Sequence, residues 1–170
     1  GYNFYNGDRS LTPTQAQERK YLFMWDQLKL KPGKKLLDIG CGYGIWLNYC
    51  KKRGVFVLGI NISKDQVDKA RSHYGLEVIH SDWETSERFL QDMENSFDAI
   101  TCMDTIEHYV SPFDKFDESS SSQKYLRLTK FISKYLQQDG IFFTSCLLLN
   151  KLYSKFTFIE WVAHYLIDHS

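Results

Sequence analysis

Five short apolar runs alternate with helical segments along this chain, and the alternation limits the possible folds more than any other feature. The apolar runs span residues 35–39, 55–60, 76–80, 97–103 and 141–149. Runs of this length and polarity are typical of strands that are covered on both faces. Helical segments are expected over residues 13–28, 45–53, 64–73, 87–93 and 124–137. Because alternating strands and helices build parallel sheets, we predict an α/β fold with a doubly wound, mostly parallel sheet.

Local signals place the ends of several segments. Thr12 to Gln15 reads as a helix cap, with proline at the first helical position and glutamine completing a capping box. The polar stretch 109–123 contains Pro112 and four consecutive serines, and we expect a surface loop there. Asp139-Gly140 is expected to end the helix over 124–137, and a last helix is expected over 157–167.

Length and composition indicate one domain. The chain has 170 residues, of which 43% are hydrophobic, enough for one core. We therefore predict a single domain over residues 1–170. It starts at Gly1 without an initiator Met and closes on an aromatic helical pattern, so we expect truncation at both ends.

Charge and cysteine usage exclude several classes of function. Lys plus Arg and Asp plus Glu both total 21, so no net charge attracts nucleic acid. The cysteines show no C-x-x-C pair and no histidine at zinc-ligand spacing, which argues against a metal site and for reduced thiols. No apolar run approaches the roughly 20 residues of a membrane span, and no signal peptide is visible. We expect a cytoplasmic protein.

The stretch KKLLDIGCGYG (34–44) ends the first predicted strand with glycines at alternate positions, 40, 42 and 44. In parallel α/β sheets the turn after the first strand is part of the ligand site, and glycine lets the backbone approach a ligand closely. The dinucleotide fingerprint needs its third glycine where Ile45 stands, and a phosphate-binding P-loop needs Gly-Lys-Ser or Gly-Lys-Thr. The spacing therefore argues against both, and a tight turn without a ligand remains the alternative.

The second predicted strand leads into Asn61, about 20 residues beyond the glycines. A group that hydrogen-bonds two ribose hydroxyls is expected at this position. The amide of Asn61 can donate to one hydroxyl and accept from the other. The alternative is an ordinary turn residue at the end of a strand.

The arrangement D-x-G-C-G-x-G after a first strand resembles motif I of the class I S-adenosylmethionine-dependent methyltransferases. Four further stretches resemble the cyclopropane fatty acid and mycolic acid synthase family. NISKDQ (61–66) is similar to its T-L-S-x-x-Q, DWE (82–84) to G-W-E, TIEHY (105–109) to A-F-E-H-F, and NGDRSLTPTQAQERK (6–20) to N-G-D-x-S-L-x-x-A-Q. They occur in the family's order and, with motif I, span most of the chain from Phe4 to about Leu149.

This resemblance implies a Rossmann-like methyltransferase fold with S-adenosyl-L-methionine as cofactor. The glycine turn would hold the methionine part with support from Asp38, Asn61 and Gln66 would contact the ribose, and Trp83 would lie against the adenine. The implied cofactor site consists of Asp38, Gly40, Cys41, Gly42, Gly44, Asn61, Ile62, Gln66, Asp82, Trp83 and Met103. For Trp83, an ordinary core aromatic is the alternative.

Glu107 and His108, after the fourth predicted strand, are the candidate catalytic residues. When an alkene is methylated, a carboxylate such as Glu107 can stabilise the resulting cation or orient a base. With an amine acceptor, Glu107 and His108 can orient the nitrogen and take its proton. A supporting or helix-capping role is the alternative for His108.

The family pattern is incomplete here. Its Tyr-Ser-Cys segment, which helps to hold the cofactor and a catalytic bicarbonate, corresponds to the start of this chain, where Gly1-Tyr2-Asn3 stands. Its substrate-covering segment and last pair of strands, which follow the fifth strand, have no counterpart in these 170 residues. Methyl transfer to a lipid acyl chain or another small molecule is the leading hypothesis. A noncatalytic cofactor-binding or interaction domain and a small-molecule N-methyltransferase remain the alternatives.

Other partners are less well supported. The prolines are Pro13, Pro32 and Pro112, so the Asn-Pro-Pro-aromatic motif of adenine-modifying DNA methyltransferases is absent after the fourth strand, and we expect no nucleic-acid partner. The aromatic stretch 156–167 favours a core helix over a lid on an acyl tunnel, so we expect at most peripheral membrane contact. The sequence does not indicate an oligomeric state.

Overall fold

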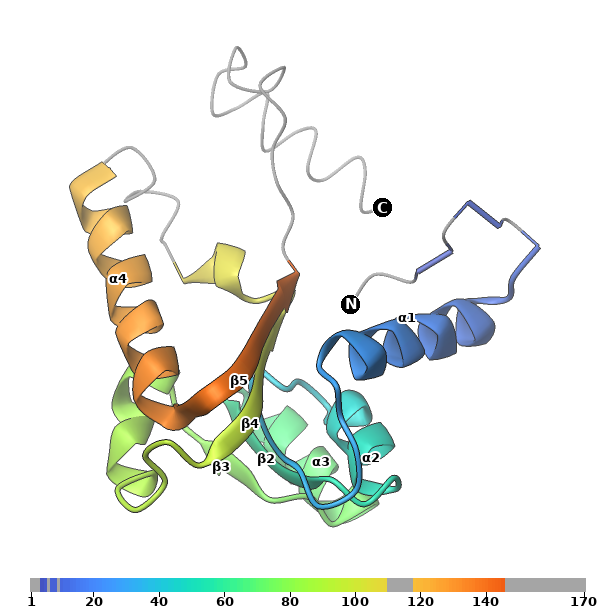
Figure 1. Ribbon diagram of the computed structural model, residues 1–170, viewed down its shortest axis with the longest axis horizontal. Helices are drawn as coiled ribbons and strands as arrows, with labels where there is room; N and C mark the ends of the chain where they lie inside the picture. The colour runs from blue at the N-terminus through green and yellow to red at the C-terminus, as the bar shows by residue number, and fades with distance from the viewer. Residues whose placement is uncertain (1–3, 6, 9, 110–117, 146–170) are drawn as a thin grey trace.

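The computed structural model of the chain describes residues 4, 5, 7, 8, 10–109 and 118–145 (Figure 1). Its helices are α1 (Pro13–Gln27), α2 (Ile45–Lys51), α3 (Lys64–Tyr74) and α4 (Glu118–Tyr135). Its strands are β1 (Lys35–Ile39), β2 (Phe56–Asn61), β3 (Val78–His80), β4 (Phe97–Met103) and β5 (Leu136–Ser145). Two 3-10 helices span Trp83–Phe89 and Ile106–His108.

The strands form one sheet in the order β3-β2-β1-β4-β5, and all its strand pairs are parallel. The predicted fold class is therefore confirmed. The chain runs from β1 outward to β3 and then crosses back to β4, so the strand order reverses beside β1. A parallel α/β sheet binds its ligands at such a switch point, beyond the carboxyl ends of the strands.

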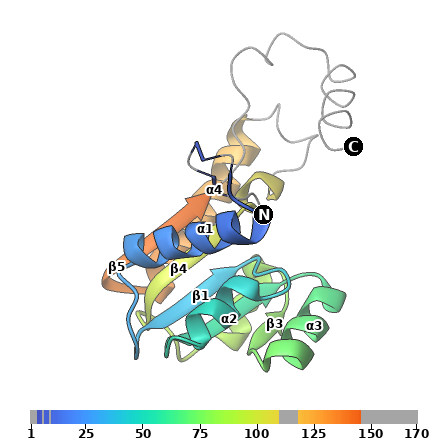
Figure 2. The same cartoon turned by 90° about the vertical axis from the view of Figure 1, so that its right-hand side faces the viewer.

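Helices cover both faces of the sheet, with α1, α2 and α3 on one side and α4 on the other (Figures 1 and 2). Successive β1 residues alternate between two cores because side chains of a strand point to opposite faces. Leu36 packs in the core beneath α1 to α3, whereas Leu37 packs with α4 and the first 3-10 helix. Both cores therefore rest on the same central strand.

Helix α1 begins where the sequence predicts. The Gln15 backbone N–H donates to Thr12 Oγ1 at 3.3 Å, and the Thr12 N–H donates to Gln15 Oε1 at 2.9 Å. Pro13 occupies the first turn, where its missing N–H costs nothing. This capping box fixes the start of the helix that later forms one wall of the site.

Three predicted elements are wrong in part. The helix expected over 87–93 is instead the 3-10 helix Trp83–Phe89, because Asp82 Oδ1 accepts the Glu84 N–H at 2.8 Å and starts the turn earlier. Helix α4 already begins at Glu118, within the loop expected over 109–123, and no Gly or Pro interrupts it before residue 124. Residues 110–117 lie outside the described residues.

Strand β5 starts at Leu136, five residues earlier than expected, and passes through Asp139-Gly140. Its pairing with β4 shifts register between Phe97 and Ala99, so a bulge absorbs the turn-like dipeptide. The strand end expected at residue 149 and the helix expected over 157–167 lie outside the described residues. In the described part of the chain, no helix has the length and apolarity to cross a membrane.

Candidate functional site

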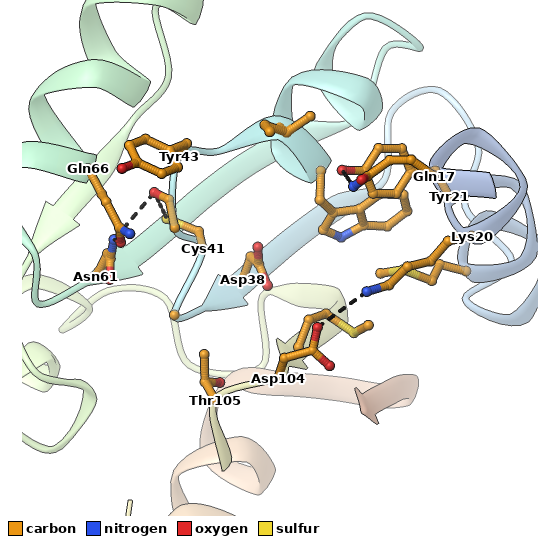
Figure 3. Close-up of a pocket in the computed structure, with 16 residues that line it drawn as sticks. Gln17, Lys20, Tyr21, Asp38, Cys41, Tyr43, Asn61, Gln66, Asp104 and Thr105 are labelled. Atoms are coloured by element: carbon orange, nitrogen blue, oxygen red, sulfur yellow. Dashed lines mark hydrogen bonds and ion pairs between the residues drawn. The ribbon is translucent and has the colours of Figure 1, made fainter. Parts of the chain in front are cut away.

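Two pockets meet at the carboxyl end of β1. The first, of about 400 Å³, lies beneath α1, and we call it the α1 pocket (Figure 3). The second, of about 320 Å³, lies beside Trp83, and we call it the Trp83 pocket. The residues that line both are Gly40, Asn61 and Thr105. A ligand that passes the glycine turn can therefore occupy both pockets.

The three glycines of the turn all have positive φ, but they are needed for different reasons. A Cβ at Gly40 would lie 2.5 Å from Thr105 Cγ2, and one at Gly44 would collide with the side chain of Leu76. Packing therefore favours glycine at position 40, and packing together with the positive φ favours it at position 44. A Cβ at Gly42 would meet nothing within 4 Å, and Gly42 lines the α1 pocket. A tight turn without a ligand thus accounts for Gly40 and Gly44, whereas Gly42 leaves a cradle open.

Asp38 places a buried carboxylate under this turn. Asp38 is 3% exposed, and its Oδ1 accepts a hydrogen bond from Thr101 Oγ1 at 2.7 Å. Burial raises the pKa of Asp38 to about 7, although the Thr101 hydrogen bond and the positive charge of Lys20 oppose this. Asp38 lines the α1 pocket, so a cationic ligand group there would favour its ionised form.

Asn61 ties the end of β2 to two neighbouring segments. Its Nδ2 donates to Gln66 Oε1 at 2.8 Å and to the Gly42 carbonyl oxygen at 3.3 Å. The structure thus brings the two predicted ribose-contacting side chains together beside the glycine turn. Asn61 lines both pockets, and Gln66 lines the α1 pocket.

The Trp83 pocket contains the predicted residues Ile62, Asp82 and Trp83. Trp83 is 5% exposed, and its ring packs 5.6 Å from that of Tyr109 and 5.7 Å from that of Phe131. Trp83 is therefore both a core aromatic and a wall of the pocket. Its flat ring suits an aromatic ligand group.

The remaining predicted residues divide between the pockets. Cys41 and Met103 line the α1 pocket, and His108 is exposed and lines the Trp83 pocket. Glu107, in the second 3-10 helix, is half-buried and lines neither of these two pockets. The catalytic roles of Glu107 and His108 stay predictions.

Sequence reasoning did not single out several residues that line the site. Helix α1 contributes Gln17, Lys20 and Tyr21, and Asp104 and Thr105 follow β4 directly. Asp104 had a signal, because an acid that directly follows a parallel strand lies at the ligand edge of the sheet. For Gln17 and Lys20, the resemblance over residues 6–20 marked the stretch but gave it no role, because the packing of α1 over the pocket is a tertiary contact.

A family model described as mycolic acid cyclopropane synthetase matches residues 3–168. Over 112 residues the chain is 38% identical to a probable fatty acid methyltransferase of Mycobacterium tuberculosis. This match covers 62% of this chain and 24% of the relative. Over 91 residues it is 38% identical to the ubiquinone biosynthesis O-methyltransferase of Pasteurella multocida, covering 47% of this chain and 38% of that relative.

Solved structures show the same fold at low sequence identity. The cyclopropane synthase MmaA2 of Mycobacterium tuberculosis superposes with a TM-score of 0.73 at 22% identity, over 98% of this chain and 56% of that one. The mycolic acid cyclopropane synthase CmaA1, complexed with SAH and CTAB, superposes with a TM-score of 0.70 at 20% identity. The match covers 99% of this chain and 57% of that one. The chain thus spans little more than half of these structures and less than half of the two curated relatives.

Proposed function

The chain belongs to the mycolic acid cyclopropane synthetase family, and on that premise we propose that its two pockets bind S-adenosylmethionine for methyl transfer to a lipid acyl chain or another small molecule. S-adenosylmethionine is the cofactor that membership of this family implies. The observation that carries the proposal is the meeting of the two pockets at the glycine turn, with Gly40, Asn61 and Thr105 common to both.

The residues present fit this cofactor. The Trp83 pocket offers an aromatic wall for adenine, and Asn61 offers an amide for the ribose hydroxyls at the junction of the pockets. The open cradle at Gly42 leads into the α1 pocket, which suits the methionine part. The indole Nε1 of Trp46, which lines the α1 pocket, is buried and finds no acceptor in the described part of the chain. Buried polar groups are normally hydrogen-bonded, and a polar ligand group in the pocket would supply the missing acceptor.

When bound, the cofactor supplies a methyl group made electrophilic by its sulfonium, so transfer depends mainly on in-line positioning. The chain's contribution is then orientation, through the glycine turn and the linked amides of Asn61 and Gln66. An acceptor that gains a methyl group often has to lose a proton. Glu107 and His108, beyond β4, are the candidates for orienting the acceptor and taking that proton.

The acceptor class follows from the relatives. The names of one curated relative and of two solved structures refer to fatty acids or to cyclopropane synthesis, and another relative is an O-methyltransferase of ubiquinone biosynthesis. The names of all four proteins refer to lipids or other small molecules, which supports an acceptor of that class. A noncatalytic cofactor-binding domain is the second candidate, because the two pockets locate a cofactor site while the catalytic roles of Glu107 and His108 stay predictions.

The cofactor site is tested by Gly42→Val with Gly33→Val as a matched control. Both glycines have positive φ, 56° and 88°, and an added Cβ at either would meet nothing within 4 Å, so both variants carry a similar backbone strain of at least about 1–2 kcal/mol. Only Gly42 lines the α1 pocket. In calorimetric titration with S-adenosylmethionine, we expect Gly42→Val to lose at least tenfold in affinity and Gly33→Val to bind like wild type. Equal binding by both variants would remove the glycine turn from the site.

Methyl transfer is tested by incubating the full-length protein with methyl-labelled cofactor and extracted lipids, metabolites and nucleic acids. Label in the lipid or metabolite fraction supports the proposal. Cofactor binding without label in any fraction supports the noncatalytic domain. Label in nucleic acid alone contradicts both.

A further inference from the structure

We propose that the ion pair between Lys20 of α1 and Asp104 after β4 recognises the amino-acid end of S-adenosylmethionine. Lys20 binds its carboxylate, and Asp104 together with Asp38 binds its ammonium group. This inference rests on the proposed function and deepens it, because it names the charged side chains that hold one end of the cofactor and gives α1 a direct role in binding.

The place of the pair in the site supports this assignment. With adenine against Trp83 and ribose beside Asn61, the rest of the cofactor has to enter the α1 pocket. Lys20 and Asp104 both line that pocket, and Figure 3 shows their charged groups pointing toward one another across it. Asp38 appears in the same view and also lines this pocket.

The pair is shielded from solvent, but it is not tightly closed. The side chains of Lys20 and Asp104 are only 14% and 16% exposed, and Lys20 Nζ lies 3.4 Å from Asp104 Oδ2. A fully formed charge-assisted bond measures about 2.7–2.9 Å. A lysine ammonium has three donors, so Lys20 can keep this partner and still donate to a ligand carboxylate.

Asp104 is held in place by the end of β5. Its φ is +54°, in the left-handed region, which aspartate adopts more readily than most residues other than glycine. Two contacts with Ser145 of β5 maintain it: the Asp104 N–H donates to the Ser145 carbonyl at 2.9 Å, and Ser145 Oγ donates to Asp104 Oδ1 at 2.6 Å. These contacts fix the carboxylate of Asp104 at the edge of the α1 pocket.

The charges of the α1 pocket suit a zwitterion. Its charged lining residues are two acids, Asp38 and Asp104, and one base, Lys20. An α-ammonium group brings a second cation to the two carboxylates, and the α-carboxylate brings a second anion to Lys20. A ligand with both groups can therefore form charge-assisted hydrogen bonds to Lys20 and to the acids, whereas a ligand that carries neither group cannot.

The test compares S-adenosylmethionine with 5′-methylthioadenosine, which keeps the adenine, ribose and thioether but lacks the amino-acid end. In calorimetric titration we expect wild type to bind S-adenosylmethionine more tightly. Lys20→Met and Asp104→Asn should each lower the affinity for S-adenosylmethionine at least tenfold. Each should change the affinity for methylthioadenosine less than twofold. Lys20→Arg, which keeps the cation, should retain most of the preference.

Lys64→Met is the matched control, because it removes a lysine–aspartate pair on the exposed surface of α3, and both affinities should stay at wild-type values. Thermal melting shows whether each variant is folded. If Lys20→Met and Asp104→Asn lower the affinities for both ligands equally, or change neither affinity, the assignment of the pair is overturned while the cofactor site stands. If wild type binds neither ligand, the proposed function fails and this inference falls with it.

Discussion

Asp38 links stability to pH through a single buried side chain. Its folded-state pKa of about 7 lies above the ordinary value of 3.8, chiefly because burial disfavours the charged form. Between these two values the folded chain retains a proton that the unfolded chain has lost. The contribution of Asp38 to stability therefore falls as the pH rises from about 4 to 7, and it stays low above pH 7.

We predict that Asp38→Asn stabilises the cofactor-free chain at pH 8, by up to about 4 kcal/mol, because the amide keeps an acceptor for Thr101 and carries no charge. The gain should shrink toward pH 4. Urea denaturation of both proteins at several pH values measures it. A stability difference that does not vary with pH would show that Asp38 is not the titrating group.

Among the elements, β4 is linked to its neighbours β1 and β5 by the side chain of Asp98 as well as by backbone pairing. Asp98 of β4 accepts hydrogen bonds from the Lys34 side chain, from the Lys35 backbone N–H at 2.8 Å and from the Gln137 side chain of β5. Burial pushes the pKa of Asp98 upward, but these hydrogen bonds outweigh it and lower the pKa below 3.8. Its stabilising effect is thus present above about pH 4 and lost as the pH falls below that value.

We predict that Asp98→Ala costs about 1–2 kcal/mol at pH 7, because two strands lose their shared acceptor. Asp68→Ala, which removes an exposed pair within α3, should stay within about 0.5 kcal/mol of wild type. Guanidinium denaturation at pH 7 and pH 3 compares the variants. The cost of Asp98→Ala should be smaller at pH 3, and an equal cost at both values would contradict the role of the ionised carboxylate.

The elements also show which parts of the structure are readable from sequence. The start of α1 and the glycine turn are encoded locally, by Thr12 with Gln15 and by the glycine spacing, and both lie where predicted. The start of β5 is not, because pairing with β4 overrides the helical pattern that precedes it. In the site, the spacing after the glycine turn predicts Asn61 and the family resemblance singles out Trp83, and both line the Trp83 pocket. Lys20 was not predicted, because only the packing of α1 over the pocket brings it there.

At the scale of the whole molecule, the two cores share the central strands of one sheet. Leu36 and Ala99 belong to the core beneath α1 to α3, and Leu37 and Ile100 to the core beneath α4. We predict a single cooperative unfolding transition, because neither core can be lost while β1 and β4 keep their places. Far-ultraviolet circular dichroism and tryptophan fluorescence should give coincident melting curves. Two separated transitions would contradict the prediction of one domain.

The placement of Thr105 determines how early during synthesis of the chain the site can be complete. Thr105 lines both pockets and packs against Gly40, yet it follows β4, long after the glycine turn in the chain. A nascent chain that has left the ribosome only as far as β3 holds the glycines and Asn61 but lacks the wall opposite them. Cofactor capture therefore belongs late in biosynthesis, once β4 has docked beside β1.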